Sequence, residues 1–90
     1  MTVADIAGMM DVSAVQAQST RADIEAVCAL AREFAVAAVF CLPAHVPYMR
    51  ACLGGGTRVK LASVSGFPGG AETTRIKAET AKELVGFGCD

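Results

Sequence analysis

Apolar residues recur at helical spacing in the segment TRADIEAVCALAREF, residues 20–34. They follow an i, i+3, i+4, i+7, i+10 pattern, at Ile24, Val27, Cys28, Ala31 and Phe34. Thr20 and Asp23 stand three residues apart at the start of the segment, which is the spacing of a capping box. The pattern predicts an amphipathic helix that starts at Thr20.

Two continuous apolar runs of strand length follow this helix. VAAVFCL covers residues 36–42 and is closed by Pro43, and VKLASVS covers residues 59–65. Because the first run is apolar on both faces, we expect a strand covered on both sides, as in a parallel sheet between helices. A further strand, carrying Asp11 and Ser13, is predicted in MMDVSAV, residues 9–15.

Three further segments have helical patterns. AHVPYMRACL, residues 44–53, has Pro47 in its first turns and stops at three consecutive glycines. TTRIKAETAKELVGFG, residues 73–88, is expected to end at Gly86 or Gly88 and to place its apolar or small residues on one stripe: Ile76, Thr80, Ala81, Leu84 and Val85. Residues 2–9 predict a short helix at the N-terminus.

Helices and strands therefore alternate, which predicts a parallel α/β sheet with right-handed crossovers. Three parallel strands leave two open sheet edges, and the few helices cover only part of the apolar surface. The chain is 53% hydrophobic with a mean hydropathy of +0.45, although a domain of 90 residues has little interior to fill. We expect part of a larger assembly, about three units of a (β/α)8 barrel, which needs roughly 250 residues.

Charge and cysteine spacing exclude several function classes. The net charge is −1 and the charged residues are scattered, so a nucleic-acid-binding surface is not expected. No apolar run approaches the ~20 residues that span a bilayer, and no signal-peptide pattern occurs, so we expect a cytoplasmic protein without membrane contact. Four cysteines form no CxxC pair and His45 is the only histidine, so we expect free, buried thiols and no metal site.

The turn-rich segment SVSGFPGGAETT, residues 63–74, connects the last expected strand to the last helix. A glycine-rich turn before a helix suggests phosphate binding, because free N–H groups at a helix N-terminus attract anions. The phosphate-loop patterns GxGxxG and GxxxxGK are both absent, however. As a βα loop at the active-site end of a barrel, the segment is expected to form one wall of a pocket.

Four segments, taken in order and spacing, resemble the deoxyribose-phosphate aldolase family: DVSAVQAQSTRADI, VAAVFCLPAHV, VKLASVSGFPGGAETTRIKAET and GFGCD. The most specific piece is VSGFPGG, residues 64–70, followed by Lys77. The resemblance runs through nearly the whole chain and implies the N-terminal part of a TIM barrel. Residues 1–90 would then be one incomplete domain, with about three parallel βα units after a short N-terminal helix.

The resemblance implies a lyase, a class I aldolase that uses a lysine Schiff base and neither metal nor cofactor. Its reaction is the reversible cleavage of 2-deoxy-D-ribose 5-phosphate to acetaldehyde and D-glyceraldehyde 3-phosphate, in deoxyribonucleotide catabolism. An iminium accepts the electrons released by C–C cleavage. The resemblance further implies that the Schiff-base lysine and the phosphate-binding loops lie on later strands. The chain alone is expected to be inactive and to need the remaining barrel strands or self-association.

The three lysines of the chain are not expected to be catalytic. Lys77 and Lys82 are predicted on solvated helix faces, and Lys60 lies early in its strand, away from the active end of a barrel. Candidate pocket-lining residues are Asp11, Ser13, Ser65 and Phe67. Asp11, expected at the C-terminal end of a strand, either lies in the pocket or is a plain loop carboxylate. The serines either line the barrel mouth or fill it.

Three of the departures from the motifs of the family bear on its chemistry. Its Asp-His-Thr-Leu-Leu appears as residues 11–15 with Val12 for histidine, and its Val-Cys-Val-Asn-Pro appears as residues 39–43 with Phe40 and Leu42 at the second and fourth positions. These departures favour an alternative, a degenerate barrel fragment with a structural or assembly role. A small sugar-phosphate-binding α/β domain is a third possibility, and the sequence leaves the choice open.

Overall fold

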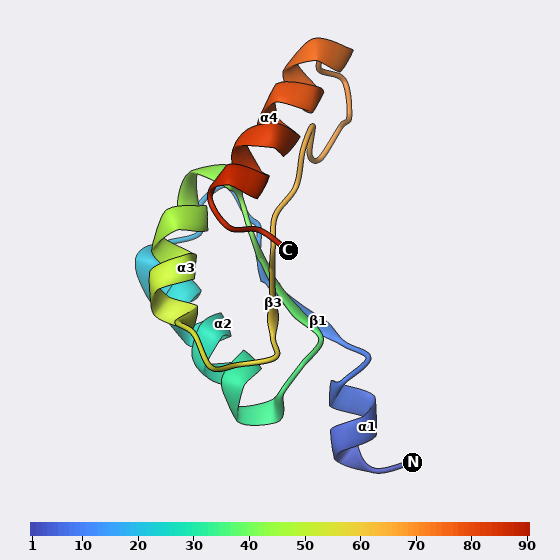
Figure 1. Ribbon diagram of the computed structural model, residues 1–90, viewed down its shortest axis with the longest axis vertical. Coiled ribbons are helices and arrows are strands. Elements are labelled where there is room, and N and C mark those ends of the chain that lie inside the picture. Colours follow the sequence, from blue (N-terminus) through green and yellow to red (C-terminus); the bar gives the residue numbers. More distant parts are fainter.

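The computed structural model describes all residues, 1–90. Helices and strands follow the expected order (Figure 1). The elements are α1 (Val3–Ala7), β1 (Asp11–Ala14), α2 (Arg21–Phe34), β2 (Ala38–Cys41), the short 3-10 helix η1 (Pro43–His45), α3 (Val46–Leu53), β3 (Lys60–Ala62) and α4 (Thr74–Gly86). Each strand is shorter than the apolar run that predicted it, because only the middle of each run pairs with a neighbour.

The three strands form one parallel sheet in the order β1-β2-β3. Asp11 lies opposite Ala38, which lies opposite Lys60. In Figure 1, α2 and α3 lie on the same side of this sheet. The fold is a partial barrel with open edges at β1 and β3, which confirms the predicted fold class. No helix is both long and apolar enough to cross a membrane.

Local sequence signals account for where the helices begin and end. The Thr20 hydroxyl accepts a hydrogen bond from the Asp23 N–H, and the Asp23 carboxylate accepts one from the Thr20 N–H, so the predicted capping box starts α2. Gly54, with φ +69°, ends α3 as expected. Thr73 accepts a hydrogen bond from the Ile76 N–H at the start of α4.

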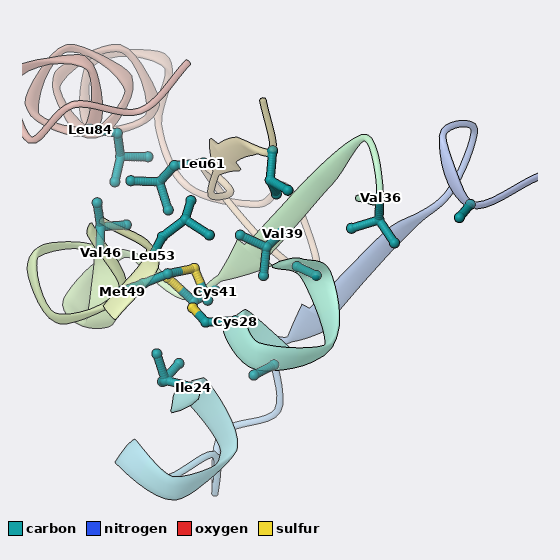
Figure 2. Packing of buried hydrophobic residues seen from close by; sticks show 14 residues of the cluster. Ile24, Cys28, Val36, Val39, Cys41, Val46, Met49, Leu53, Leu61 and Leu84 are labelled. Carbon is teal, nitrogen blue, oxygen red and sulfur yellow. The ribbon is translucent and has the colours of Figure 1, made fainter. Parts of the chain in front are cut away.

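One hydrophobic cluster holds these elements together. It fills the space between the sheet and helices α2 and α3, and Figure 2 shows Val39, Cys41 and Leu61 of the sheet within it. Ile24 and Cys28 reach this cluster from α2, and no polar or charged residue is buried there. Phe34 does not join it and stays 43% exposed, where it lines an apolar hollow together with Val3 and Ile6 of α1.

The opposite face of the sheet, which we call the inner face, is not covered by any helix. Ala38 and Phe40 of β2 are half-buried on this face, and Ser13 and Lys60 beside them are exposed. The prediction that the second strand is covered on both sides is therefore wrong. The helices that follow β1 and β2 pack on the other face, and three strands cannot curl far enough to close the inner face.

Helix α4 packs less than its sequence suggested. Of its expected apolar stripe only Leu84 is buried, whereas Val85 is 70% exposed, because the helix touches the sheet only near its C-terminal end (Figure 1). Cys89 and Asp90 form no strand. The Asp90 N–H nevertheless donates to the Leu61 carbonyl (2.8 Å), and the Asp90 carboxylate accepts from the Leu61 N–H (2.9 Å), so Asp90 lies along the open edge of β3.

Candidate functional site

A hollow of about 230 Å³ lies on the inner face of the sheet. Its lining residues are Asp11, Ser13, Val15, Phe40, Val64 and Phe67. Alternate residues of a strand point to the same face, so Asp11 and Ser13 of β1 face the hollow together. Ser13 is paired with Phe40 of β2, which brings a hydroxyl beside an aromatic ring. The chain therefore brings together three of the four candidate residues: Asp11, Ser13 and Phe67.

The position of Asp11 within its strand differs from the prediction. It was expected at the C-terminal end of a strand, but it is the first residue of β1. Helix α1 ends at Gly8 and the Ala37 N–H already donates to the Met10 carbonyl, so pairing with β2 begins just before Asp11. Its carboxylate therefore lies farther than Ser13 from the loops that follow the strands.

Ser65 is held away from the hollow. Its hydroxyl donates to the backbone carbonyl of Lys77 at 2.7 Å, which ties the loop after β3 to α4. The Ser63 hydroxyl donates to the Cys41 carbonyl at 2.7 Å and links the ends of β3 and β2. Both serines are thus engaged in hydrogen bonds between segments that lie far apart in the sequence.

The GFPGGA loop carries Phe67 to the edge of the hollow. Gly66 and Gly70 adopt left-handed φ angles of +73° and +70°, and the Gly70 N–H donates to the Gly66 carbonyl. Lys77, expected on a solvated helix face, lies against this loop and donates from Nζ to the Gly70 carbonyl at 3.1 Å. That prediction is wrong because the loop folds back over the first turn of α4. Through Phe67 the loop contributes to the lining of the hollow.

No lysine lines the hollow. Lys60 is exposed at the first position of β3, as expected, and Lys82 is exposed on α4. The amine of Lys77 donates a hydrogen bond to the Gly70 carbonyl. Among the described residues, no set of three or more His, Cys, Asp and Glu side chains is arranged to hold a metal ion.

No cysteine lines the hollow. Burial raises the pKa of the Cys41 thiol to about 12, and burial also raises the pKa of Cys28. Both side chains lie in the hydrophobic cluster (Figure 2), whereas the hollow lies on the opposite face of the sheet. His45 is half-buried in η1 and is absent from the lining of the hollow.

The departures from the family motifs fall on different faces of the sheet. Val12 packs against the hydrophobic cluster and so does not touch the hollow, whereas Phe40 forms part of its lining. Leu42 lines a neighbouring depression together with Phe67. The sequence did not single out Val15 and Val64 as lining residues. Strand alternation from Asp11 and Ser13 points to Val15, and alternation along β3 points to Val64.

The hollow combines one carboxylate, one hydroxyl and an apolar wall. Such a surface is able to hydrogen-bond the hydroxyl groups of a small ligand and to pack against its carbon atoms. It contains no side chain that forms a covalent intermediate with a carbonyl compound by the Schiff-base route, because that route needs an amine. Binding, orientation and proton transfer by the Asp11 carboxylate are the chemical roles open to these residues.

Comparison with known proteins gives a consistent result at the level of sequence. No family model matches the chain. The deoxyribose-phosphate aldolase of Sinorhizobium medicae is 37% identical over 81 residues, which are 90% of this chain and 33% of that protein. The Micrococcus luteus enzyme of the same name is 34% identical over 90 residues, 100% of this chain and 39% of that protein. The chain thus spans between about a third and two fifths of the length of these relatives.

Solved structures agree with the sequence relatives. A candidate deoxyribose-phosphate aldolase from Coccidioides immitis superposes with a TM-score of 0.91 and 30% identity, covering 99% of this chain and 35% of that one. The deoxyribose phosphate aldolase of Aeropyrum pernix, described as tetrameric, superposes with a TM-score of 0.84 at 23% identity, which supports the fold alone; it covers 98% of this chain and 37% of that one. Sequence and fold together show that the chain is similar to the N-terminal part of deoxyribose-phosphate aldolases.

Proposed function

We propose that this chain forms the first three βα units of an aldolase barrel and supplies one wall of its substrate pocket, without the nucleophile. The observation that carries the proposal is the uncovered inner face, where Asp11 and Ser13 share a hollow that no lysine lines. On this proposal residues 1–90 are one incomplete domain. The reaction of the assembled barrel is reversible cleavage of 2-deoxy-D-ribose 5-phosphate to acetaldehyde and D-glyceraldehyde 3-phosphate.

The residues of the hollow would bind and orient the sugar phosphate. The Asp11 carboxylate accepts hydrogen bonds from sugar hydroxyls, and the Ser13 hydroxyl both donates and accepts. Phe40 and Phe67 exclude water from the carbon chain. A Schiff base requires a neutral lysine, which enzymes obtain by desolvation or by a neighbouring cation. Lys60 and Lys82 are exposed, so the nucleophile of the proposed reaction belongs to the part of the barrel outside these residues.

The first test is chemical trapping on the chain alone. The native chain is incubated with acetaldehyde and borohydride, and peptides carrying each lysine are examined by mass spectrometry. We expect no saturable adduct, and equal background labelling of Lys60, Lys77 and Lys82 in the native and the urea-unfolded chain. A stable, saturable adduct at one of these lysines in the native chain alone would sink the proposal that the nucleophile lies elsewhere.

The second test is complementation. The chain is co-expressed with the part of the Sinorhizobium medicae relative that lies beyond the matched region, and cleavage of 2-deoxyribose 5-phosphate is measured. We expect activity only in the pair, and a reduction of roughly tenfold or more in kcat/KM with Ser13→Ala, since one polar contact is lost. Val85→Ala, far from the hollow on α4, serves as the matched control and leaves the rate unchanged. Activity of the 90-residue chain alone would contradict the proposal.

A structural or assembly role is the second candidate, and one observation favours it. Phe40 lies in the hollow and Leu42 beside it, at positions where the family resemblance implies cysteine and asparagine. If the chain only completes a barrel, the complemented pair forms but stays inactive. The double variant Phe40→Cys, Leu42→Asn separates the two candidates, because activity that appears only in this variant identifies the natural chain as an assembly subunit.

We also propose the cytoplasm as the site of action, within deoxyribonucleotide catabolism. All four cysteines are free, which suits a reducing compartment. Cell fractionation followed by immunodetection tests this, and recovery of the protein with the envelope fraction would contradict it. A small-molecule-binding role for the chain alone is tested by NMR titration with 2-deoxyribose 5-phosphate. Saturable chemical-shift changes at Ser13 and Phe67 would support this role.

A further inference from the structure

The loop of residues 65–70 is the part of the site whose conformation depends most on another element. It contributes Phe67 to the hollow, although Phe67 itself is 48% exposed and is not anchored in the hydrophobic cluster. An aromatic side chain on an exposed loop forms a defined wall only if the backbone on both sides of it is fixed. The contacts of α4 with this loop therefore decide the shape of the hollow.

We propose that Lys77 is a positioning residue that holds the loop of residues 65–70, so that Phe67 closes one side of the hollow. Three contacts with Lys77 carry the proposal, and they lie on both sides of Phe67. The Lys77 backbone carbonyl accepts the Ser65 hydroxyl at 2.7 Å, and its Nζ donates to the Gly70 carbonyl at 3.1 Å. Its aliphatic stem packs on Gly66, where a Cβ would stand only 2.7 Å from Lys77 Cδ.

The two glycines fit this arrangement for separate reasons. Gly66 has φ +73° and no room for a side chain beneath the lysine stem, so it is required by both conformation and contact. Gly70 has φ +70° and open space around it, so only its backbone conformation favours glycine. Its N–H donates to the Gly66 carbonyl and closes the loop. The Lys77 amine donates a hydrogen bond to the carbonyl of this same Gly70, which holds the closed loop in place.

This role differs from that of a nucleophile. The Lys77 amine serves the loop as a hydrogen-bond donor, and the charged ammonium is the stronger donor. It is half-buried, with its stem against the loop, and does not line the hollow. The inference deepens the proposed function, because the loop it fixes is the pocket wall. It concerns loop order in the absence of substrate, however, and can hold even if the chain proves to have no part in an aldolase reaction.

The test is solution NMR of the 90-residue chain with the variant Lys77→Met, which keeps an aliphatic stem and removes the donor. We expect amide hydrogen exchange at Gly70 to accelerate about fivefold or more, since one charge-assisted hydrogen bond is lost. We also expect weaker nuclear Overhauser contacts between the Phe67 ring and the Val64 methyl groups. Lys77→Arg, which retains a cationic donor, should restore most of the exchange protection.

Lys82→Met is the matched control, since Lys82 lies on the same helix, is exposed, and donates no hydrogen bond to the loop. The proposal is overturned if the amide of Gly70 exchanges at the same rate in Lys77→Met as in Lys82→Met. Exchange at Leu61 in β3 reports whether each variant is folded. If Lys77→Met does not fold, Ser65→Ala removes the other side-chain tie, and unchanged Phe67 contacts in that variant likewise overturn the proposal. If Lys77→Met loosens the loop but the natural chain fails in the complementation test, only the proposed aldolase function is refuted and the role of Lys77 stands.

Discussion

Two of the four cysteines are completely buried between the sheet and its helices, and burial is the largest cause of the raised pKa of each thiol. Cys28 and Cys41 have no exposed surface, and burial raises the pKa of Cys41 to about 12. Thiolates, not thiols, react with electrophiles. We therefore expect iodoacetamide at pH 8 to modify Cys41 at least about a hundredfold more slowly in the native chain than in urea. Peptide mass spectrometry gives the rates, with half-buried Cys52 as internal reference.

The same burial makes the free energy of unfolding fall as the pH becomes alkaline. The folded-state pKa of Cys41 lies above its ordinary value of 9.0, so the unfolded chain loses the thiol proton first. Its contribution is fully present below about pH 9 and is lost as pH rises towards 12. Urea titrations at pH 8, 9 and 10 should show a falling free energy of unfolding. The slope should be smaller in Cys41→Val, and an identical slope in both proteins would contradict the assignment to Cys41.

The sequence could predict some of the site at this scale but not all of it. Asp11 and Ser13 share a face by strand alternation, and the GFPGGA turn places Phe67 next to them, so local patterns suffice for these three. Lys77 was misjudged because its surroundings depend on how a loop folds back over α4. Ser65 was misjudged for the same reason, since its partner is twelve residues away. Contacts of that kind are set by tertiary structure.

Helix starts were the most predictable features at the scale of elements. The capping box predicted at Thr20 is present, and the structure adds a second one at Thr2, but the two helices bury very different surfaces. Helix α2 contributes three buried residues to the cluster, whereas α1 buries only Ala7. Strand lengths were overestimated, because Val36 and Leu42 continue the apolar run beyond the paired part of β2. Apolar character reports burial, and pairing needs a neighbouring strand.

This difference between the helices yields a matched prediction. Thr20→Ala removes the side-chain acceptor that starts α2, and we expect the free energy of unfolding to fall by about 1 kcal/mol. Thr2→Ala removes the equivalent group from α1, and we expect a much smaller loss, because α1 is five residues long and adds little to the cluster. Urea titration of both variants is the measurement. Equal losses would show that α1 is as tightly coupled to the fold as α2.

Two uncovered surfaces characterise the whole molecule. One is the inner face of the sheet, and the other is an apolar groove beside the open edge of β1. The groove is lined only by hydrophobic residues: Val3, Ile6, Ala7, Met10, Val12, Leu30, Phe34 and Val36. Phe34 and Leu30 are each 43% exposed there. The excess of apolar residues in the sequence already indicated such surfaces, but their location depends on which side of the sheet the helices take.

Water against these surfaces is unfavourable, and we expect the isolated chain to self-associate at micromolar concentrations. Sedimentation velocity over a concentration series should show a rising mean mass. Phe34→Glu places a charge in the groove and should weaken association about tenfold or more, because a carboxylate is costly to bury. Val85→Glu introduces the same charge at a residue that is 70% exposed on α4, outside the groove, and should leave association unchanged. If both variants weaken association equally, the added charge and not the groove controls association. If the natural chain is strictly monomeric, its open faces tolerate water and the prediction is wrong.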